Sequence, residues 1–158
     1  MRGAMLFVAG IVVGAAVQTG VAQSTEGSGV ILNHVGLSVP STADAAAFYI
    51  QKMGFREAFR NNDGTSIYIQ VSKNTFIELQ QANAQRPAGL NHFGMEAPDI
   101  TKAVAFFKAH GATATEPGPP SAFSKARLAN VTDLNGLRIE LAELGPESLQ
   151  RKAIESWK

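Results

Sequence analysis

The chain has 158 residues, 45% of them hydrophobic, and its 14 basic and 13 acidic side chains give a formal net charge of +1. This length and apolar content suit one compact domain with a substantial core. The balanced charge argues against nucleic-acid partners, which need a concentrated basic surface. The sequence contains no cysteine, which excludes disulfides, cysteine-ligated zinc and iron–sulfur clusters.

The first 23 residues differ in character from the rest. Arg2 precedes an uncharged apolar run from Ala4 to Val17, and the small residues Gly20 and Ala22 follow it. This pattern is typical of a signal peptide over residues 1–23, cleaved at or near Ala22. An uncleaved membrane anchor is the alternative, although the run is short for a bilayer span of about 20 residues. We therefore expect an exported protein, periplasmic or secreted, without stable membrane insertion after cleavage. Residues 24–29 indicate a flexible linker.

The remainder of the chain contains an internal repeat. Asn33-His34-Val35-Gly36 returns 58 residues later as Asn91-His92-Phe93-Gly94. A second pair closes each copy, Phe76-Ile77-Glu78-Leu79 in the first and Arg138-Ile139-Glu140-Leu141 in the second. Each copy thus begins with a histidine and ends with a glutamate, both within strand-like runs. A repeat of this size indicates a fold built from two similar units.

The first unit covers residues 30–81. Alternating polar and apolar residues predict a strand over residues 30–39, and Pro40 ends it. Ser41 is a suitable N-cap for a helix that continues to about Met53, where Gly54 stops it. Three short strands are expected next, over residues 55–60, 65–71 and 75–81, which makes a βαβββ module.

The second unit covers residues 89–144 and repeats this order. A strand over residues 90–97 precedes a helix from the N-cap Asp99 to His110, and then come a weak strand over 112–116 and strands over 125–131 and 137–143. The proline-rich residues 117–124 predict an exposed loop. Residues 145–158 predict a short packing helix. The fold class is therefore α+β, with two βαβββ modules, at 30–81 and 89–144, forming a curved mixed sheet.

The repeated histidines and glutamates form a candidate metal site. In a strand, side chains two residues apart share a face, and His34, Glu78, His92 and Glu140 each lie opposite the apolar side chains of their own strand. If the two curved sheets face each other, all four converge. Two imidazoles and two carboxylates suit one divalent ion such as Zn, Ni, Co, Fe or Mn. The third histidine, His110, lies outside this pattern, at a helix C-terminus.

With these motifs the chain resembles the vicinal oxygen chelate superfamily, to which glyoxalase I belongs, over about residues 30–144. The resemblance implies a ligand set of His34, Glu78, His92 and Glu140, as in glyoxalase I. Methylmalonyl-CoA epimerases are similar but usually carry glutamine at the position of Glu78, so the glutamate favours the lyase. Ser38 and Ala82 stand where glyoxalase I enzymes commonly have an arginine and an asparagine, so the resemblance favours the metal chemistry over the use of glutathione.

The resemblance implies a metal-dependent lyase or isomerase that transfers a proton next to a metal-chelated carbonyl, with Glu140 or Glu78 as the catalytic base. Two alternatives stay open: an exported binding protein that does no chemistry, and an Fe(II)-dependent dioxygenase. The partners expected are a small-molecule substrate and a second copy of the chain in a homodimer, with the two halves paired within one chain or swapped between two. Side chains that we expect to line the substrate site are Ser38, Tyr68, Gln70, Gln80, Arg127 and Arg138.

Overall fold

The computed structural model describes residues 27–158. The expected signal peptide, residues 1–23, and the first part of the expected linker lie outside the described residues. Within residues 27–158, no helix is both long enough and apolar enough to cross a membrane. The expected homodimer stays a prediction, because the structure contains a single chain.

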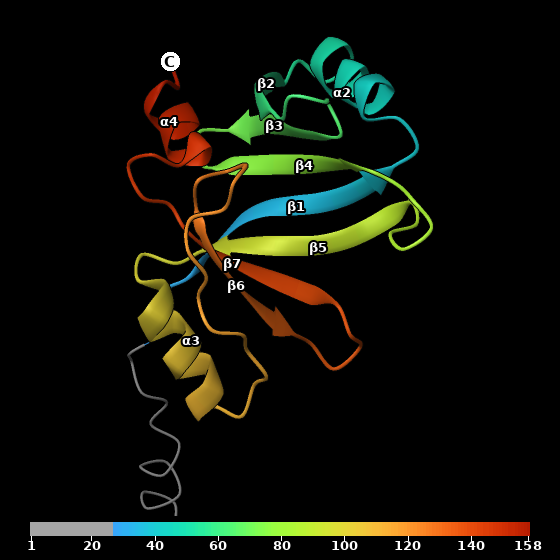
Figure 1. Cartoon of the computed structure of the whole chain (residues 1–158). Coiled ribbons are helices and arrows are strands. Elements are labelled where there is room, and N and C mark those ends of the chain that lie inside the picture. Colours follow the sequence, from blue (N-terminus) through green and yellow to red (C-terminus); the bar gives the residue numbers. More distant parts are fainter. Residues whose placement is uncertain (1–26) are drawn as a thin grey trace, which may run out of the picture.

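One curved sheet of seven strands, in the order β2-β3-β4-β1-β5-β7-β6, forms the centre of the molecule (Figure 1). This arrangement confirms the predicted α+β class with a curved mixed sheet. The strands are β1 (Ile31–Val39), β2 (Arg56–Arg60), β3 (Ser66–Ser72), β4 (Thr75–Gln81), β5 (Gly89–Glu96), β6 (Arg127–Thr132) and β7 (Arg138–Glu143), and the helices are α2 (Thr42–Gln51), α3 (Ile100–Ala109) and α4 (Leu149–Glu155).

The two halves of the repeat meet at the middle of this sheet. β1 pairs in parallel with β4, and β5 pairs in parallel with β7. The two halves are then joined by antiparallel pairing of β1 with β5. In this chain, therefore, the two modules pair with each other directly, within one continuous sheet.

The second half has one strand fewer than the first. The strand expected over residues 112–116 was wrong, since only Ala114 pairs there, in an isolated bridge to Val131. Single backbone hydrogen bonds still run from Gly118 to Leu128 and from Ser121 to Ala126, but the prolines between them have no N–H to donate, so no regular strand forms. Residues 117–124 lack regular strand structure, as expected, but Phe123 is partly buried and its ring lies 5.6 Å from that of Phe59.

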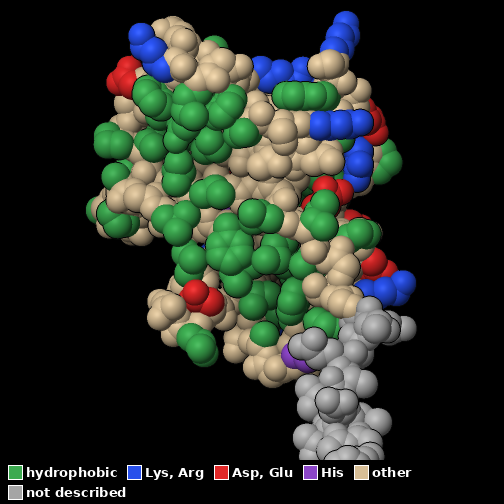
Figure 2. Space-filling view, turned by 180° about the vertical axis from the view of Figure 1, so that it is seen from behind, with side chains coloured by type: hydrophobic (Ala, Val, Ile, Leu, Met, Phe, Trp, Pro, Cys, Tyr) green, Lys and Arg blue, Asp and Glu red, His purple; other side chains and the backbone are tan. Residues whose placement is uncertain are grey.

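Helices α2 and α3 cover one face of the sheet. The predicted N-caps are confirmed, because Ser41 Oγ accepts from the backbone of Asp44 and Asp99 Oδ1 accepts from that of Lys102. Apolar side chains of α2 pack on β3 and β4, and those of α3 pack on β6 and β7. Figure 2 shows hydrophobic side chains spread over much of one side of the molecule, with Lys and Arg side chains toward its rim.

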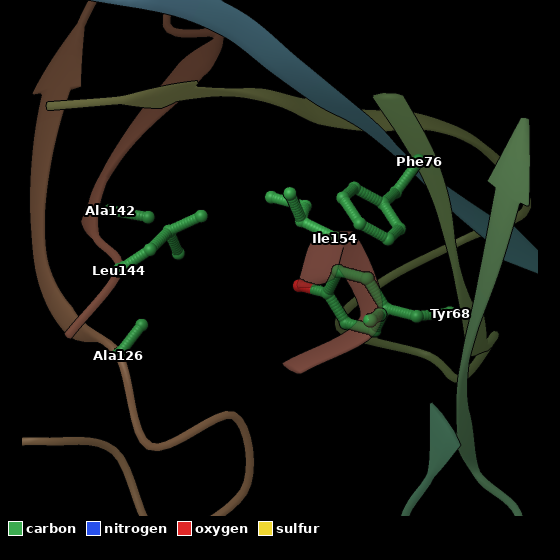
Figure 3. Packing of buried hydrophobic residues seen from close by; sticks show 7 residues of the cluster. Tyr68, Phe76, Ala126, Ala142, Leu144 and Ile154 are labelled. Carbon is green, nitrogen blue, oxygen red and sulfur yellow. The ribbon is translucent and has the colours of Figure 1, made fainter. Parts of the chain in front are cut away.

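Helix α4 lies against the other face, which we call the inner face because it carries His34 and the strand positions in register with it. Figure 3 shows Ile154 of α4 beside Tyr68 and Phe76, with Ala126, Ala142 and Leu144 opposite. Polar contacts add to this packing: Arg151 Nη2 lies 3.0 Å from Glu96 Oε1, and Arg56 Nη2 donates to the carbonyl of Ala153. The end of the inner face near the start of β4 and the end of β7 is thereby filled.

The pairing of β1 with β5 explains the glycines of the repeated motif. In this register His34 lies opposite Gly94, and His92 lies opposite Gly36. Each imidazole occupies the space over the glycine of the other strand. A methyl group at Gly94 would overlap the ring of His34, and one at Gly36 would overlap the ring of His92. Each copy of the motif therefore provides the room that the histidine of the other copy needs.

We predict that Gly94→Ala lowers the free energy of unfolding by about 1–3 kcal/mol, because the added methyl group displaces a buried imidazole in a packed sheet. Urea denaturation measures this loss. Gly118→Ala is the matched control, since its methyl group makes only an ordinary contact with the carbonyl of Leu128 at 3.8 Å. Equal stability of the two variants would contradict the crosswise packing of histidine on glycine.

Candidate metal centre

Four neighbouring strands bring the expected ligands together on the inner face. His34 lies on β1, Glu78 on β4, His92 on β5 and Glu140 on β7, and these strands are consecutive in the sheet. Both imidazoles are fully buried, whereas Glu78 and Glu140 are 5% and 7% exposed. The convergence results from the curvature of one continuous sheet, not from two separate sheets that face each other.

The distances between donor atoms fit a single bound ion. His34 Nε2 lies 3.0 Å from His92 Nε2 and 3.6 Å from Glu140 Oε1. Glu78 Oε2 lies 3.2 Å from His92 Nε2 and 4.0 Å from His34 Nε2. Two donors that each bind one ion at about 2.1 Å are about 3.0 Å apart at a right angle and about 4.2 Å apart on opposite sides. In particular, donor atoms of His34, His92 and Glu140 all lie within 4.8 Å of one another.

His34 presents a free Nε2 because Asn33 fixes the other ring nitrogen. Asn33 Nδ2 donates to the carbonyl of Asn74 at 3.2 Å, which turns the amide oxygen toward His34. His34 Nδ1 lies 3.1 Å from this oxygen and must donate to it, since an amide oxygen only accepts. The lone pair then resides on Nε2, which faces the other candidate ligands. This is the arrangement in which metal-binding histidines are usually held.

His92 has a similar neighbour but a less restricted ring. Its Nδ1 lies 2.7 Å from Asn91 Oδ1, an acceptor, and 2.8 Å from Arg138 Nη2, a donor. Either tautomer of His92 is therefore satisfied at Nδ1. Binding of an ion at Nε2 selects the tautomer whose Nδ1 donates to Asn91, and Arg138 Nη2 then retains Asn91 Oδ1 as an acceptor at 3.2 Å.

Both asparagines lie at irregularities of the sheet. The register between β1 and β5 shifts between Leu32 and His34, at Asn33, and again where the pairing passes from His92 to Leu90, at Asn91. A bulge of this kind re-aims a side chain that regular alternation would send to the opposite face. Each asparagine can therefore contact the histidine that follows it in the sequence.

Burial and neighbouring charges shift the pKa values of these groups in different directions. Burial lowers the pKa of His34 to about 4, so this imidazole is neutral near pH 7. Burial acts to raise the pKa of Glu78, but hydrogen bonds and charge from His92, Gln80 and His34 lower it below its usual range. Burial and the nearby Glu78 carboxylate raise the pKa of Glu140. The site thus combines a neutral imidazole donor with one carboxylate that ionises readily and one that retains its proton longer.

The residues expected to contact substrate fall into three groups. Ser38, Gln80 and Arg138 lie toward the end of the inner face opposite α4, and Gln80 and Arg138 bind the two carboxylates, Glu78 Oε1 and Glu140 Oε2, each at 2.8 Å. Tyr68 lies beside the site, with its ring centre 5.7 Å from that of His34. Burial and the carboxylates of Glu78 and Glu140 raise the pKa of Tyr68 well above its usual range, so its hydroxyl stays protonated.

Two of the expected substrate residues lie elsewhere. Gln70 is fully buried beneath α4 and donates to the carbonyls of Lys73 and Ala153, so its polar atoms already have structural partners. Arg127 lies on the face covered by α3, with its Nη1 3.4 Å from Glu143 Oε2. Strand alternation places Arg127 with Ala129 and Val131 of the α3 cluster, and the expectation that it faces the site was therefore wrong.

Several residues at the site were not expected from the sequence. Asn33 and Asn91 orient the histidines, Ser66 Oγ lies 3.4 Å from Glu78 Oε1, and Asn130 Oδ1 accepts from Arg138 Nη1 at 3.3 Å. Gln150 contacts Asn33 from α4. The repeated Asn-His pair was a signal for the asparagines, whereas no sequence pattern connects Gln150 with this site.

The chain belongs to the glyoxalase/bleomycin resistance protein/dioxygenase superfamily, whose family model matches residues 31–141. This match confirms the resemblance seen in the repeated motifs. No curated protein sequence gives a significant match.

Solved structures have the same fold. A hypothetical protein from Bacillus halodurans C-125 has a TM-score of 0.62 and 19% identity, over 75% of this chain and 97% of that chain. Methylmalonyl-CoA epimerase from Mycobacterium tuberculosis has a TM-score of 0.59 and 19% identity, over 73% and 89%. The Streptomyces coelicolor methylmalonyl-CoA epimerase has a TM-score of 0.58 and 15% identity, over 71% and 95%. At these identities the likeness establishes the fold alone.

The lowered pKa of His34 predicts a pH dependence of stability in the metal-free protein. Between pH 6.5 and 4 the unfolded chain binds a proton at this position and the folded chain does not. Acidification through this window will therefore lower the free energy of unfolding, with a contribution from His34 of at most about 3 kcal/mol. The raised pKa of Glu140 changes the free energy of unfolding in the opposite direction. The contribution of His34 is therefore measured as the difference in unfolding free energy between the wild type and His34→Gln at each pH. An identical pH dependence in both proteins would contradict the buried, neutral imidazole.

Proposed function

We propose that this chain is a divalent-metal-dependent enzyme, of the lyase or isomerase kind, that transfers a proton at a carbon atom next to a carbonyl. The observation that carries the proposal is the buried convergence of His34, His92 and Glu140. Buried ionisable groups need a partner to compensate for lost hydration, and a shared divalent ion is a partner that both donor types, imidazole and carboxylate, accept. Glu78 completes the proposed ligand set of His34, Glu78, His92 and Glu140.

A divalent ion bound by these residues would neutralise the negative charge that develops on a carbonyl oxygen when the neighbouring C–H bond loses its proton. The side chains of the site have different proposed roles. His34 and His92 hold the site as imidazole donors, and the partly exposed Arg138 supports Glu140 through its contact with Oε2. Lyases and epimerases that act next to a carbonyl both begin with removal of this proton, so the site supports the shared step.

Glu140 is the better candidate for the base. A general base works best when its pKa approaches the working pH, and in the metal-free protein the pKa of Glu140 is raised whereas that of Glu78 is lowered. In the proposed step Oε1 of Glu140 is not bound to the ion; it takes up the C–H proton, and the same carboxyl group returns it to the adjacent carbon atom. Glu78 then stays ionised, as a ligand.

The polar end of the inner face supports a small, oxygen-rich substrate. Ser38, Gln80 and Arg138 lie toward this end, and the side chain of Arg138 is 37% exposed, which leaves it accessible to a ligand. The opposite end is filled by α4 and its apolar neighbours. Ser38 stands where glyoxalase I enzymes commonly carry an arginine, so the proposal does not specify glutathione as the thiol of the substrate. The proposed export of the protein rests on residues 1–23 alone.

Elemental analysis of the tag-free protein tests the metal site. We expect about one divalent ion per chain, and loss of that ion in both His34→Ala and His92→Ala, because each variant removes a buried donor. His110→Ala is the control, since His110 lies at the C-terminal end of α3 and its Nδ1 contacts the carbonyl of Phe106. If the protein takes up no metal after reconstitution with Zn, Ni, Co, Fe(II) and Mn, the enzyme proposal fails and the fold serves binding alone.

Replacement of the proposed base tests the chemistry. We expect Glu140→Gln to lower turnover of thiol adducts of 2-oxoaldehydes by about 10²–10⁴-fold, the usual contribution of a positioned acid or base, while some metal stays bound. Glu143→Gln is the matched control on the same strand, because Glu143 faces the opposite side and accepts from the backbone of Ile100. Full turnover by Glu140→Gln would exclude Glu140 as the base.

A further inference from the structure

A buried contact connects the C-terminal helix with the first histidine of the site. Gln150 of α4 is 1% exposed. Its Nε2 donates to Asn33 Oδ1 at 2.8 Å, across 117 residues of sequence. The same oxygen accepts from His34 Nδ1. Hydrogen bonds thus connect Gln150 to the candidate metal ligand His34 through the side chain of Asn33.

The second half of the molecule contains the same arrangement with a different donor. There Asn91 Oδ1 lies next to His92 Nδ1 and also accepts from Arg138 Nη2 at 3.2 Å. Each asparagine oxygen therefore has two neighbours, the histidine that it orients and one further donor. Arg138 provides the further donor from β7, within the repeat itself.

The first half cannot provide its donor in this way. Arg138 lies opposite His92 in the sheet, and the residue opposite His34 is Phe76. A phenyl ring has no N–H group to offer to Asn33. Gln150 supplies the missing donor from α4, a helix that lies beyond the repeat and beyond residues 31–141, which the family model matches.

The packing of α4 holds Gln150 in place. Ala153 and Ile154 of the same helix are buried among Tyr68, Phe76 and Leu144, and Arg151 Nη2 lies 3.0 Å from Glu96 Oε1. These contacts fix the backbone of α4 and so hold the Cα of Gln150 above Asn33. The helix therefore places the donor where the asparagine oxygen can accept from it.

We propose that Gln150 is a positioning residue that holds Asn33, and through it His34, in the orientation that leaves His34 Nε2 free for a metal ion. The proposal rests on the metal site of the proposed function. Without Gln150, only the carbonyl of Asn74 fixes the Asn33 amide. An amide turned by 180° presents a donor to His34 Nδ1, and the proton of the imidazole then moves to Nε2, where it blocks metal binding.

Gln150→Met tests the proposal, because methionine keeps the length and approximate volume of glutamine but cannot donate. We expect the affinity for Mn²⁺ or Co²⁺, measured by calorimetry, to fall by about 10-fold or more, as it does when partners of metal-binding histidines are removed. In the metal-free protein, the ¹⁵N chemical shifts of the His34 ring will move from those of the Nδ1–H tautomer toward those of the Nε2–H tautomer.

Ile154→Ala is the matched control on α4. It removes apolar contacts from the same helix and lowers stability, but it leaves the donor of Gln150 in place. We expect a lower Tm with unchanged His34 shifts and nearly unchanged metal affinity. Equal losses of affinity in both variants would assign the effect to loosening of α4, and would overturn the positioning role of Gln150.

The two readouts separate this proposal from the proposed function. If the wild-type protein binds no metal, the proposed function fails, while the ¹⁵N shifts of the metal-free protein still report the tautomer of His34. If metal binds, and Gln150→Met matches the wild type in both affinity and shifts, the positioning role is wrong although the metal site stands.

Discussion

The antiparallel pairing of β1 with β5 is the interaction on which the rest of the structure depends. It joins the two halves into one sheet and brings Nε2 of His34 to 3.0 Å from Nε2 of His92. The parallel partners of these strands, β4 and β7, then place Glu78 and Glu140 beside the histidines. The candidate site therefore exists only where the two halves meet, and neither half contains it alone.

Much of the fold and the ligand set followed from two regularities of the sequence. The 58-residue offset between the Asn-His motifs identified two similar units, and the two-residue period of a strand placed the histidines and glutamates opposite the apolar core. Caps such as Ser41 and Asp99 marked the helix starts. These features are local or repeated, so they can be read without knowledge of which strands pair.

The residues that the sequence could not place depend on long-range or irregular geometry. Strict alternation sends Asn33 and Asn91 away from the histidines, and the register shifts of the β1–β5 pairing bring them back. Gln150 reaches Asn33 only because α4 packs on the inner face. Arg127 and Gln70 were expected to be neighbours of the site on its cavity side, whereas Glu143 and α4 respectively occupy their polar atoms. Polarity identifies a group that needs a partner but not which partner it has.

The crosswise packing of each histidine on the glycine of the other strand has a consequence for the history of the repeat. After a duplication, two copies are usually free to diverge independently, because each retains its own internal contacts. Here Gly94 makes room for the imidazole at position 34, and Gly36 makes room for the imidazole at position 92. A chain that keeps one histidine must therefore keep the glycine in the opposite copy, whereas a chain that has lost the histidine is free to vary that glycine.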